Sequence, residues 1–299
     1  MKSCCHWNTA PACDTRPDMP PHSPLQQTIT RLLNQPDESI HLAQTALTIA
    51  RLEYPELDID DYLRQIHEMA LEIHHRLPDT ANAADVLKQL NHVLFIEKGF
   101  EGNGDSYYDP RNSFLNDVID RKLGIPISLS ILYMEVGQAL GLPLTGVSFP
   151  GHFLVKLEIS DGAIVLDPYF GGLSLSEEDI EERLQEYYGP RHSKSRTHGV
   201  LATCSNKDIL LRMLRNLRNL YMQASQFEKA LVFADLMVEL DEDQADALKA
   251  RAAIYDQLEC HTPALADYSA YLKISAETQG NKYIRARVID LAQSVRQVC

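Results

Sequence analysis

The spacing of apolar residues predicts helices in the first third of the chain. In SIHLAQTALTIARLEY, apolar residues recur every three or four positions, and Tyr54-Pro55 ends the run, so a helix should end near Glu53. DIDDYLRQIHEMALEIHHRL has the same spacing, and the acidic residues at its start suit the positive end of a helix. We therefore expect a helical region over residues 25–98.

A different pattern follows over residues 99–190. The glycine-rich segment GFEGNGDSYYDPRNS predicts a loop. ISLSILYMEVGQALG is apolar on nearly every side, which predicts a buried helix with Pro126 in its first turn and Gly141 at its end. LSLSEEDIEERLQEYYGP predicts a short acidic helix capped by Ser176. TGVSFPGHFLVKLE and AIVLDPYF alternate between apolar and polar residues, which predicts two strands.

The two predicted strands place a histidine and an aspartate on the same face. His152 opens the first strand, and the alternation of side chains puts Asp167 on its side of the sheet. A two-residue turn at Asp161-Gly162 would nevertheless set Asp167 opposite Lys156, roughly 13 Å along the strand from His152. A bulge, a longer loop or strong twist is needed to bring the two side chains together.

The last third of the chain contains a sequence repeat. An offset of 34 positions superposes Tyr221 on Tyr255 and Ala230 on Ala264. This period is the tetratricopeptide signature, in which paired helices stack and bury their faces against neighbouring pairs. We expect residues 205–299 to form two degenerate repeats, followed by a final helix over IRARVIDLAQSVRQV.

Charge and composition narrow the class of protein. The net charge of −14 disfavours binding to nucleic acid or to anionic lipid, and no apolar run is long enough to cross a bilayer. Residues 1–24 lack the apolar segment of a secretory signal and are expected to be a disordered leader. The six cysteines follow no framework spacing, which fits reduced thiols and a cytoplasmic protein.

Several of these segments, in this order, resemble a known family. They are YYDPRNSFLNDVIDRKLGIPISLSILYMEVGQALGLPLTGVSFPGHFLVKLE, then VLDPYFGG, then LLRMLRNLRNLY. They are similar to a bacterial family of SirB-type invasion-regulator homologues, which joins a transglutaminase-like domain to tetratricopeptide repeats. The resemblance implies an α+β fold, with a papain-like, transglutaminase-type core over residues 99–190 and a helical repeat tail.

The resemblance also implies a catalytic arrangement, of which one member is missing. Active transglutaminase-like enzymes use a cysteine at the start of the central helix, a histidine on the next strand and an aspartate on the strand after it. His152 and Asp167 match the second and third positions, but no cysteine occurs between Cys13 and Cys204. Ser128 stands near the expected position, and a serine hydroxyl is far harder to ionise than a thiol.

Two hypotheses about function follow. The first is a non-catalytic scaffold that binds a protein partner through its repeats and a relic cleft, to which Asn112 and Asn116 contribute polar groups, although a helix-capping role also explains Asn112. The second is an acyl-transfer or amide-hydrolysing enzyme that uses Ser128, His152 and Asp167. The missing cysteine favours the first, and the retained pair keeps the second open. Neither hypothesis calls for a cofactor or a metal ion, and the oligomeric state is open.

Overall fold

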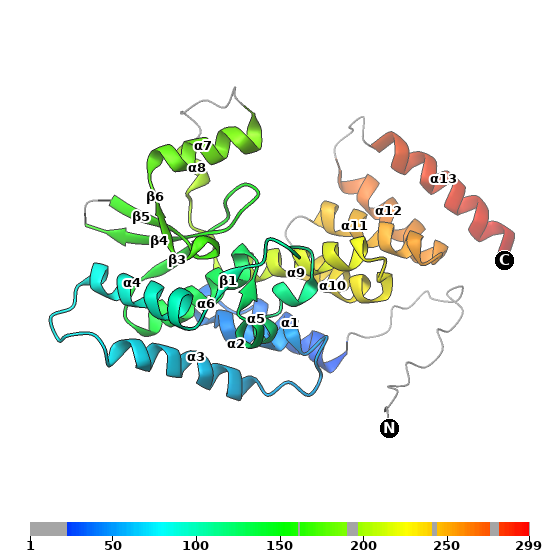
Figure 1. Ribbon diagram of the computed structural model, residues 1–299. Helices are drawn as coiled ribbons and strands as arrows, with labels where there is room; N and C mark the ends of the chain where they lie inside the picture. Colours follow the sequence, from blue (N-terminus) through cyan, green and yellow to red (C-terminus); the bar gives the residue numbers. More distant parts are fainter. Residues whose placement is uncertain (1–22, 161, 190–196, 241–243, 276–280, 299) are drawn as a thin grey trace. The chain divides into compact units, whose positions relative to one another are not determined.

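Figure 1 shows the computed structural model, which describes residues 23–160, 162–189, 197–240, 244–275 and 281–298. Its contacts divide the chain into two compact units, Pro24–Leu217 and a helical unit that begins at Arg218. The predicted leader lies almost entirely outside the described residues. No helix in the described ranges is both long enough and apolar enough to cross a membrane.

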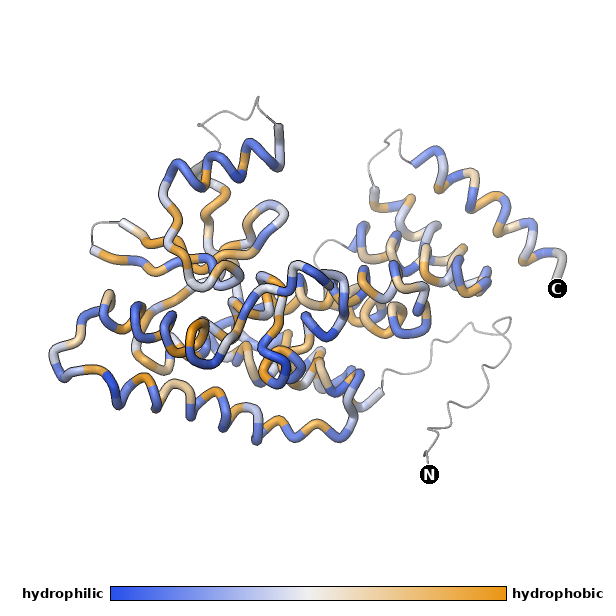
Figure 2. Tube along the Cα trace, in the orientation of Figure 1, coloured by the Kyte–Doolittle hydropathy of each residue, from blue (hydrophilic) through white to orange (hydrophobic). Residues whose placement is uncertain are grey.

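Helices open the first unit, as the apolar spacing predicts. They are α1 (Pro24–Leu33), α2 (Leu42–Ala50), α3 (Ile59–His74) and α4 (Ala83–Asn91), with a 3-10 turn, η2 (Asp37–Ser39), between the first two. The helix expected to end near Glu53 ends at Ala50. In Figure 2, α3 alternates between polar and apolar residues along its length, and its apolar face is buried at Ile66, Met69, Ala70 and Ile73. A π-helical turn, η3 (His92–Glu97), follows α4 directly.

The buried helix predicted from the apolar run is α6 (Pro126–Ala139), and this prediction is confirmed. Nearly all of its residues are buried, and it packs against α2, α3 and the sheet. A loop, the 3-10 turn η4 (Pro110–Asn112) and α5 (Leu115–Arg121) precede it. Two short strands, β1 (Glu101–Gly102) and β2 (Leu123–Gly124), pair in parallel beside them.

A four-stranded antiparallel sheet packs on α6, in the order β3 (Leu144–Val147), β4 (Leu154–Ile159), β5 (Gly162–Asp167) and β6 (Leu173–Leu175). The segment predicted as one strand is therefore two, β3 and β4. A turn over residues 148–153 separates them, and Gly151 in this turn has a φ of +68°, which glycine adopts without strain. His152 lies in this turn and precedes β4 by two residues.

The predicted strand register is wrong by two residues. The ladder between β4 and β5 pairs Ile159 with Gly162 and Val155 with Leu166, so Asp167 lies beyond the last pair and not opposite Lys156. The reason is that Gly162 is part of the strand, where the prediction had assigned it to the turn. This shift brings Asp167 two residues closer to His152 and removes half of the expected gap.

The helix α7 (Glu177–Tyr188) follows the sheet, and the predicted cap is confirmed. Ser176 and Asp179 form a capping box, in which the side chain of each accepts a hydrogen bond from the backbone N–H of the other. Ile180 and Leu184 of α7 pack in one apolar cluster with residues of the sheet. A 3-10 turn, η5 (Pro168–Phe170), joins β5 to β6, and α8 (Thr197–Val200) leads to α9 (Asn206–Gln223).

The second unit repeats its backbone structure at the offset found in the sequence. Its helices are the end of α9, then α10 (Phe227–Leu240), α11 (Gln244–Gln257), α12 (His261–Ile274) and α13 (Asn281–Val298). The bounds of α12 lie 34 positions after those of α10, and the end of α11 lies 34 positions after the end of α9. Ser225 and Glu259, which share this offset, both have a φ of +56°. The sequence repeat is thus a repeat of helices and of the turns between them.

One prediction about the cysteines needs correction. Cys204 is a free thiol, and burial raises its pKa to about 11. Cys260 takes part in a disulfide bond, so the prediction of reduced thiols throughout the chain is wrong at this position. The position of Cys260 within the sequence repeat does not indicate that it forms a disulfide bond.

Candidate functional site

The structure brings His152 and Asp167 into contact. The Nε2 atom of His152 lies 2.9 Å and 3.0 Å from the two carboxylate oxygens of Asp167. His152 lies in the turn before β4, and Asp167 is the last residue of β5, so the contact joins two neighbouring chain segments at the same end of the sheet. The convergence expected from side-chain alternation is therefore observed, and a catalytic role for the pair stays a prediction.

Asp167 also binds a partner that the sequence analysis missed. The Nη1 atom of Arg183, on α7, lies 2.5 Å from a carboxylate oxygen of Asp167, and the backbone N–H of Tyr169 donates to the other oxygen at 3.1 Å. Burial of Asp167 would raise its pKa, but the contacts with His152 and Arg183 outweigh burial and hold the pKa below its ordinary value. The sequence signal was a single arginine in the otherwise acidic segment EEDIEERLQEYY.

Aromatic rings surround the imidazole of His152. Tyr169 contacts it edge-on with ring centres 5.8 Å apart, and Phe170 stacks on it at 6.1 Å. The Arg183 guanidinium lies 5.4 Å from the centre of the Phe170 ring. Nε2 is engaged by Asp167, whereas Nδ1 has no hydrogen-bond partner among the described residues. The imidazole therefore presents one free nitrogen, held in place by the carboxylate and the rings.

A second arginine fixes the turn that carries His152. Arg212, on α9, donates hydrogen bonds to the Ser148 hydroxyl and to the His152 carbonyl oxygen, each at 2.6 Å, and weaker ones to the carbonyl of Phe149. Its guanidinium also lies 5.5 Å from the centre of the Phe153 ring. The Arg212 side chain thus ties both ends of the turn to α9.

Ser128 forms its hydrogen bonds with other residues than His152 and Asp167. Its side chain is buried, and its hydroxyl lies 2.5 Å from the carbonyl oxygen of Asn112. The backbone N–H of Ile125 donates to the same hydroxyl at 3.1 Å, which caps the first turn of α6. In the described part of the chain no hydrogen bond joins Ser128 to His152. The hydroxyl acts as a helix cap that also holds the preceding loop.

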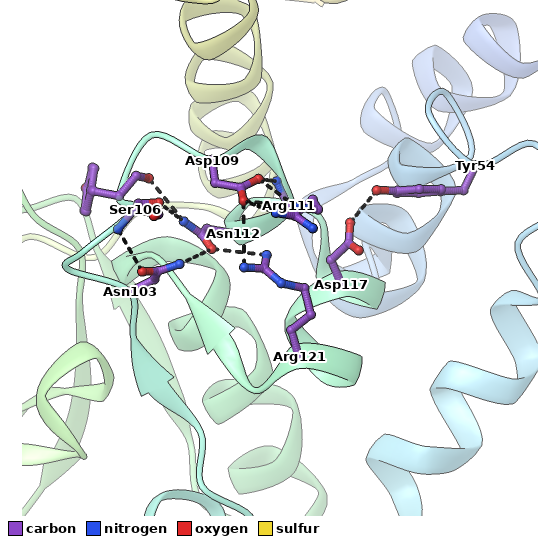
Figure 3. A network of polar contacts seen from close by, with 9 residues as sticks. Tyr54, Asn103, Ser106, Asp109, Arg111, Asn112, Asp117 and Arg121 are labelled. Atoms are coloured by element: carbon purple, nitrogen blue, oxygen red, sulfur yellow. Dashed lines mark hydrogen bonds and ion pairs between the residues drawn. The ribbon is translucent and has the colours of Figure 1, made fainter.

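Asn112 organises that loop and does not cap α5, so the capping interpretation of Asn112 is wrong (Figure 3). Its amide donates to the carbonyl oxygen of Ser106 at 2.7 Å, and its side-chain oxygen accepts from Asn103 at 3.0 Å and from Arg121 at 3.3 Å. The residue at the cap position of α5 is Phe114. Asn112 is fully buried, so its side chain holds the loop from within.

Charged groups hold the outer side of the same loop (Figure 3). Arg111 donates to Asp109 at 2.6 Å, and this contact lowers the pKa of the Asp109 carboxyl. The hydroxyl of Tyr54 donates to Asp117 at 2.6 Å and so joins the residues after α2 to α5. The loop that receives the Ser128 hydroxyl is therefore fixed on both sides.

Asn116 lies near this region but forms no such bonds. It is buried on α5, and its side-chain oxygen has no hydrogen-bond partner in the described ranges. The side-chain oxygens of Ser113 and Ser130 are also buried without a hydrogen-bond partner in these ranges. Neither Asn112 nor Asn116 is hydrogen-bonded to His152 or Asp167, and their placement in a cleft stays a prediction.

The described residues offer no arrangement suited to a metal ion. In those ranges no group of three or more histidine, cysteine, aspartate and glutamate side chains lies close enough to hold one. Cys4, Cys5, His6 and Cys13, whose side chains are of types that bind metal ions, lie outside the described residues. Asp167, the most buried carboxylate of the site, is already occupied by His152 and Arg183.

The match to a family model spans this whole arrangement. The model described as the transglutaminase-like superfamily matches residues 60–215, which include the central helix, the sheet, His152, Asp167 and Arg183. The chain belongs to the transglutaminase-like superfamily. The match extends on both sides of residues 99–190, the range predicted for the transglutaminase-like core.

Relatives of this transglutaminase-like chain align over most of their length. A UPF0162 protein of Xylella fastidiosa is 38% identical over 257 residues, which cover 86% of this chain and 92% of the relative. A UPF0162 protein of Vibrio cholerae is 30% identical over 250 residues, covering 81% and 90%. The UPF0162 protein YchA of Escherichia coli is 27% identical over 243 residues, covering 81% and 88%. The alignments therefore extend beyond the transglutaminase-like part into the helical unit.

Proposed function

We propose that the chain is a non-catalytic transglutaminase-like scaffold that binds a protein partner in the cytoplasm. One observation carries the non-catalytic part: the hydroxyl at the expected nucleophile position, that of Ser128, is buried and bonded to the backbone carbonyl of Asn112. A nucleophilic serine must transfer its proton to a base and reach the substrate. Ser128 meets neither condition.

The alternative, an acyl-transfer or amide-hydrolysing enzyme using Ser128, His152 and Asp167, requires the Ser128 hydroxyl to give up its present hydrogen bonds. The Ser128 hydroxyl would have to leave the carbonyl of Asn112 and release the N–H of Ile125. Both contacts would be lost in a buried setting, where an unpaired polar group costs about 1–3 kcal/mol. The network around Asn112 opposes such a movement because it fixes the loop to α5.

A structural role accounts for the retained histidine and aspartate. Asp167 accepts hydrogen bonds from His152, Arg183 and the backbone of Tyr169, which lie on three different segments. A buried carboxylate with several donors holds such segments together, since removing any donor leaves part of its charge uncompensated. The pair thus fastens the turn before β4 to the end of β5 and to α7.

The helical unit supports the partner-binding part of the proposal. Its helices and turns recur at a spacing of 34 positions, which is the spacing of tetratricopeptide repeats, and stacked repeats offer extended surfaces to other proteins. On α13, Tyr283 is 72% exposed and Ile289 is 59% exposed. Both side chains are therefore accessible to a protein partner.

Co-purification with matched variants tests this function. Tagged full-length chain is recovered from its own cells, and retained proteins are identified by mass spectrometry. We expect a specific protein to be retained by the wild type, by Ser128→Ala and by the surface control Lys282→Gln, and to be lost from the double variant Tyr283→Lys, Ile289→Asp. Retention of nothing beyond an untagged sample, or equal retention by all variants, would contradict binding through this unit.

A further inference from the structure

A pocket of about 640 Å³ lies on the first unit, beside the candidate site. The end of α4 and the π-helical turn after it form one side, and the turn after β5 forms the other. Its lining residues are Lys88, Gln89, Asn91, His92, Phe95, Ile96, Phe170 and Gly171. Phe170 is shared with the His152 site, where its ring stacks on the imidazole. Its volume is within the range of ligand-binding pockets in proteins.

The aromatic walls of the pocket are held in place from behind. Phe170 stacks on His152 and contacts Arg183, while Phe95 stacks on Tyr133 with ring centres 5.8 Å apart. Walls that are already ordered lose little conformational freedom when a ligand binds, which favours affinity. The π-helical turn that carries Phe95 and Ile96 is an irregularity that often occurs at binding sites.

Asn91 joins the two sides of the pocket. Its amide donates to the carbonyl oxygen of Gly172 at 3.1 Å, and its oxygen accepts from the Tyr133 hydroxyl at 2.7 Å. The turn over Gly171 and Gly172 has positive φ at both residues, +69° and +74°. This conformation places Phe170 against the pocket, and the Asn91 bond keeps it there.

The charge at the rim of the pocket is positive. Lys88 is exposed and forms no ion pair among the described residues, whereas His92 lies 3.1 Å from Glu97. The ammonium group of Lys88 therefore offers an unmatched positive charge beside apolar walls in a chain whose net charge is −14. A ligand with an apolar body and an adjacent carboxylate complements both features.

We propose that this pocket binds an aromatic or long aliphatic side chain next to a carboxylate, presented by an extended segment of the protein partner. The proposal rests on the proposed function and names the chemistry that the partner presents. A protein segment fits better than a free small molecule because Ile96 is 72% exposed and Phe170 is 57% exposed. Pockets for small ligands enclose most of the ligand, whereas these open walls need a larger partner to cover them.

Fluorescence polarisation with defined peptides tests the proposal on the full-length chain. The probes are fluorescein-labelled glycine-serine peptides that carry Phe-Asp, Phe-Lys, Ala-Asp or Ala-Ala at the centre. We expect the Phe-Asp peptide to bind at least about tenfold more tightly than the others, which corresponds to about 1.4 kcal/mol. Equal binding of all four peptides, or no binding of any, would overturn the proposal.

Three variants locate the binding in this pocket. Ile96→Asp changes an exposed side chain, so the fold should persist, and it should weaken Phe-Asp binding by about tenfold or more. Ile159→Asp, at an exposed apolar position that does not line the pocket, is the matched control and should bind as the wild type does. Lys88→Glu should reverse the preference in favour of the Phe-Lys peptide. Unchanged preference in Lys88→Glu would rule out the assigned charge contact.

These readouts are separate from those of the proposed function. If the wild type binds no peptide but still retains a protein partner that the α13 variant loses, the proposal for the pocket is wrong and the proposed function stands. Reaction at Ser128 would overturn the non-catalytic scaffold whether or not the peptides bind. Binding of free 3-phenylpropionate with the affinity of the Phe-Asp peptide would assign the pocket to a small carboxylate and contradict a protein segment.

Discussion

The hydroxyl of Ser128 and the carbonyl oxygen of Asn112 lie 2.5 Å apart, although 16 positions separate the two residues along the chain. The contact joins the first turn of α6 to the loop before α5. In the transglutaminase-like pattern, the start of this helix is the expected position of a nucleophile. In this chain the same position holds two backbone segments together.

This relationship predicts a loss of stability when the hydroxyl is removed. Ser128→Ala should lower the free energy of unfolding by about 1–2 kcal/mol, because it deletes a helix cap and leaves the carbonyl of Asn112 with one bond fewer in a buried place. Urea denaturation followed by circular dichroism measures the effect. A variant as stable as the wild type would contradict the cap.

Ser130→Ala is the matched control for that measurement. Ser130 lies on the same helix and is equally buried, but its hydroxyl has no hydrogen-bond partner in the described ranges. Its removal should leave the free energy of unfolding unchanged or slightly raised, since an unpaired polar group is lost. Equal losses for both serines would assign the effect to packing and not to the hydrogen bond.

The buried carboxylate predicts a specific pH dependence. The folded state holds the pKa of Asp167 below its unfolded value, so its ionised form contributes stability above about pH 4, and this contribution is lost as the pH falls through the lower, folded pKa. In Asp167→Asn the contribution is absent at every pH. The unfolding free energy of this variant should therefore fall less steeply below about pH 4 than that of the wild type.

Chemical denaturation at a series of acidic pH values measures that slope. Asp105→Asn, which removes one carboxylate from the exposed loop, should retain the wild-type slope. If Asp167→Asn and the wild type lose stability in parallel as the pH falls, the contacts of the Asp167 carboxylate with His152 and Arg183 do not stabilise the fold as described.

The turn that places Phe170 predicts a difference between two adjacent glycines. Both have positive φ, but a side-chain carbon at Gly172 would overlap the amide of Asn91, whereas one at Gly171 would meet nothing closer than 4.0 Å. Gly171→Ala should cost about 1 kcal/mol from backbone strain alone, and Gly172→Ala should cost more. Thermal unfolding of the two variants compares them, and equal melting temperatures would contradict the close approach.

The elements governed by local chemistry were predictable from the sequence. The buried helix follows from its apolar run, and the cap at Ser176 from the residues beside it. The pairing of His152 with Asp167 followed from alternation together with the family resemblance. The strand register did not, because Gly162 is equally suited to the turn and to the strand end, and only the ladder decides between them.

The contacts that sequence reasoning missed are those between distant segments. Arg183, on α7, contacts Asp167 at the end of β5, and the only sign of this pair in the sequence is a single arginine in an acidic segment. Asn112 suggested a cap because it precedes a helix, yet its side chain turns back into its own loop. The pocket beside Phe170 joins two segments far apart in sequence, so no local pattern could reveal it.

Covalent labelling tests the central claim, that Ser128 is a structural residue and the site is non-catalytic. Wild-type chain is treated with a fluorophosphonate probe, which reacts with activated serines, and its intact mass is compared with those of Ser128→Ala and His152→Ala; a serine hydrolase treated in parallel confirms that the probe is active. The account predicts no mass increase at Ser128 in any of the three proteins. Stoichiometric labelling of the wild type at Ser128, lost in both variants, would contradict it and establish a serine enzyme.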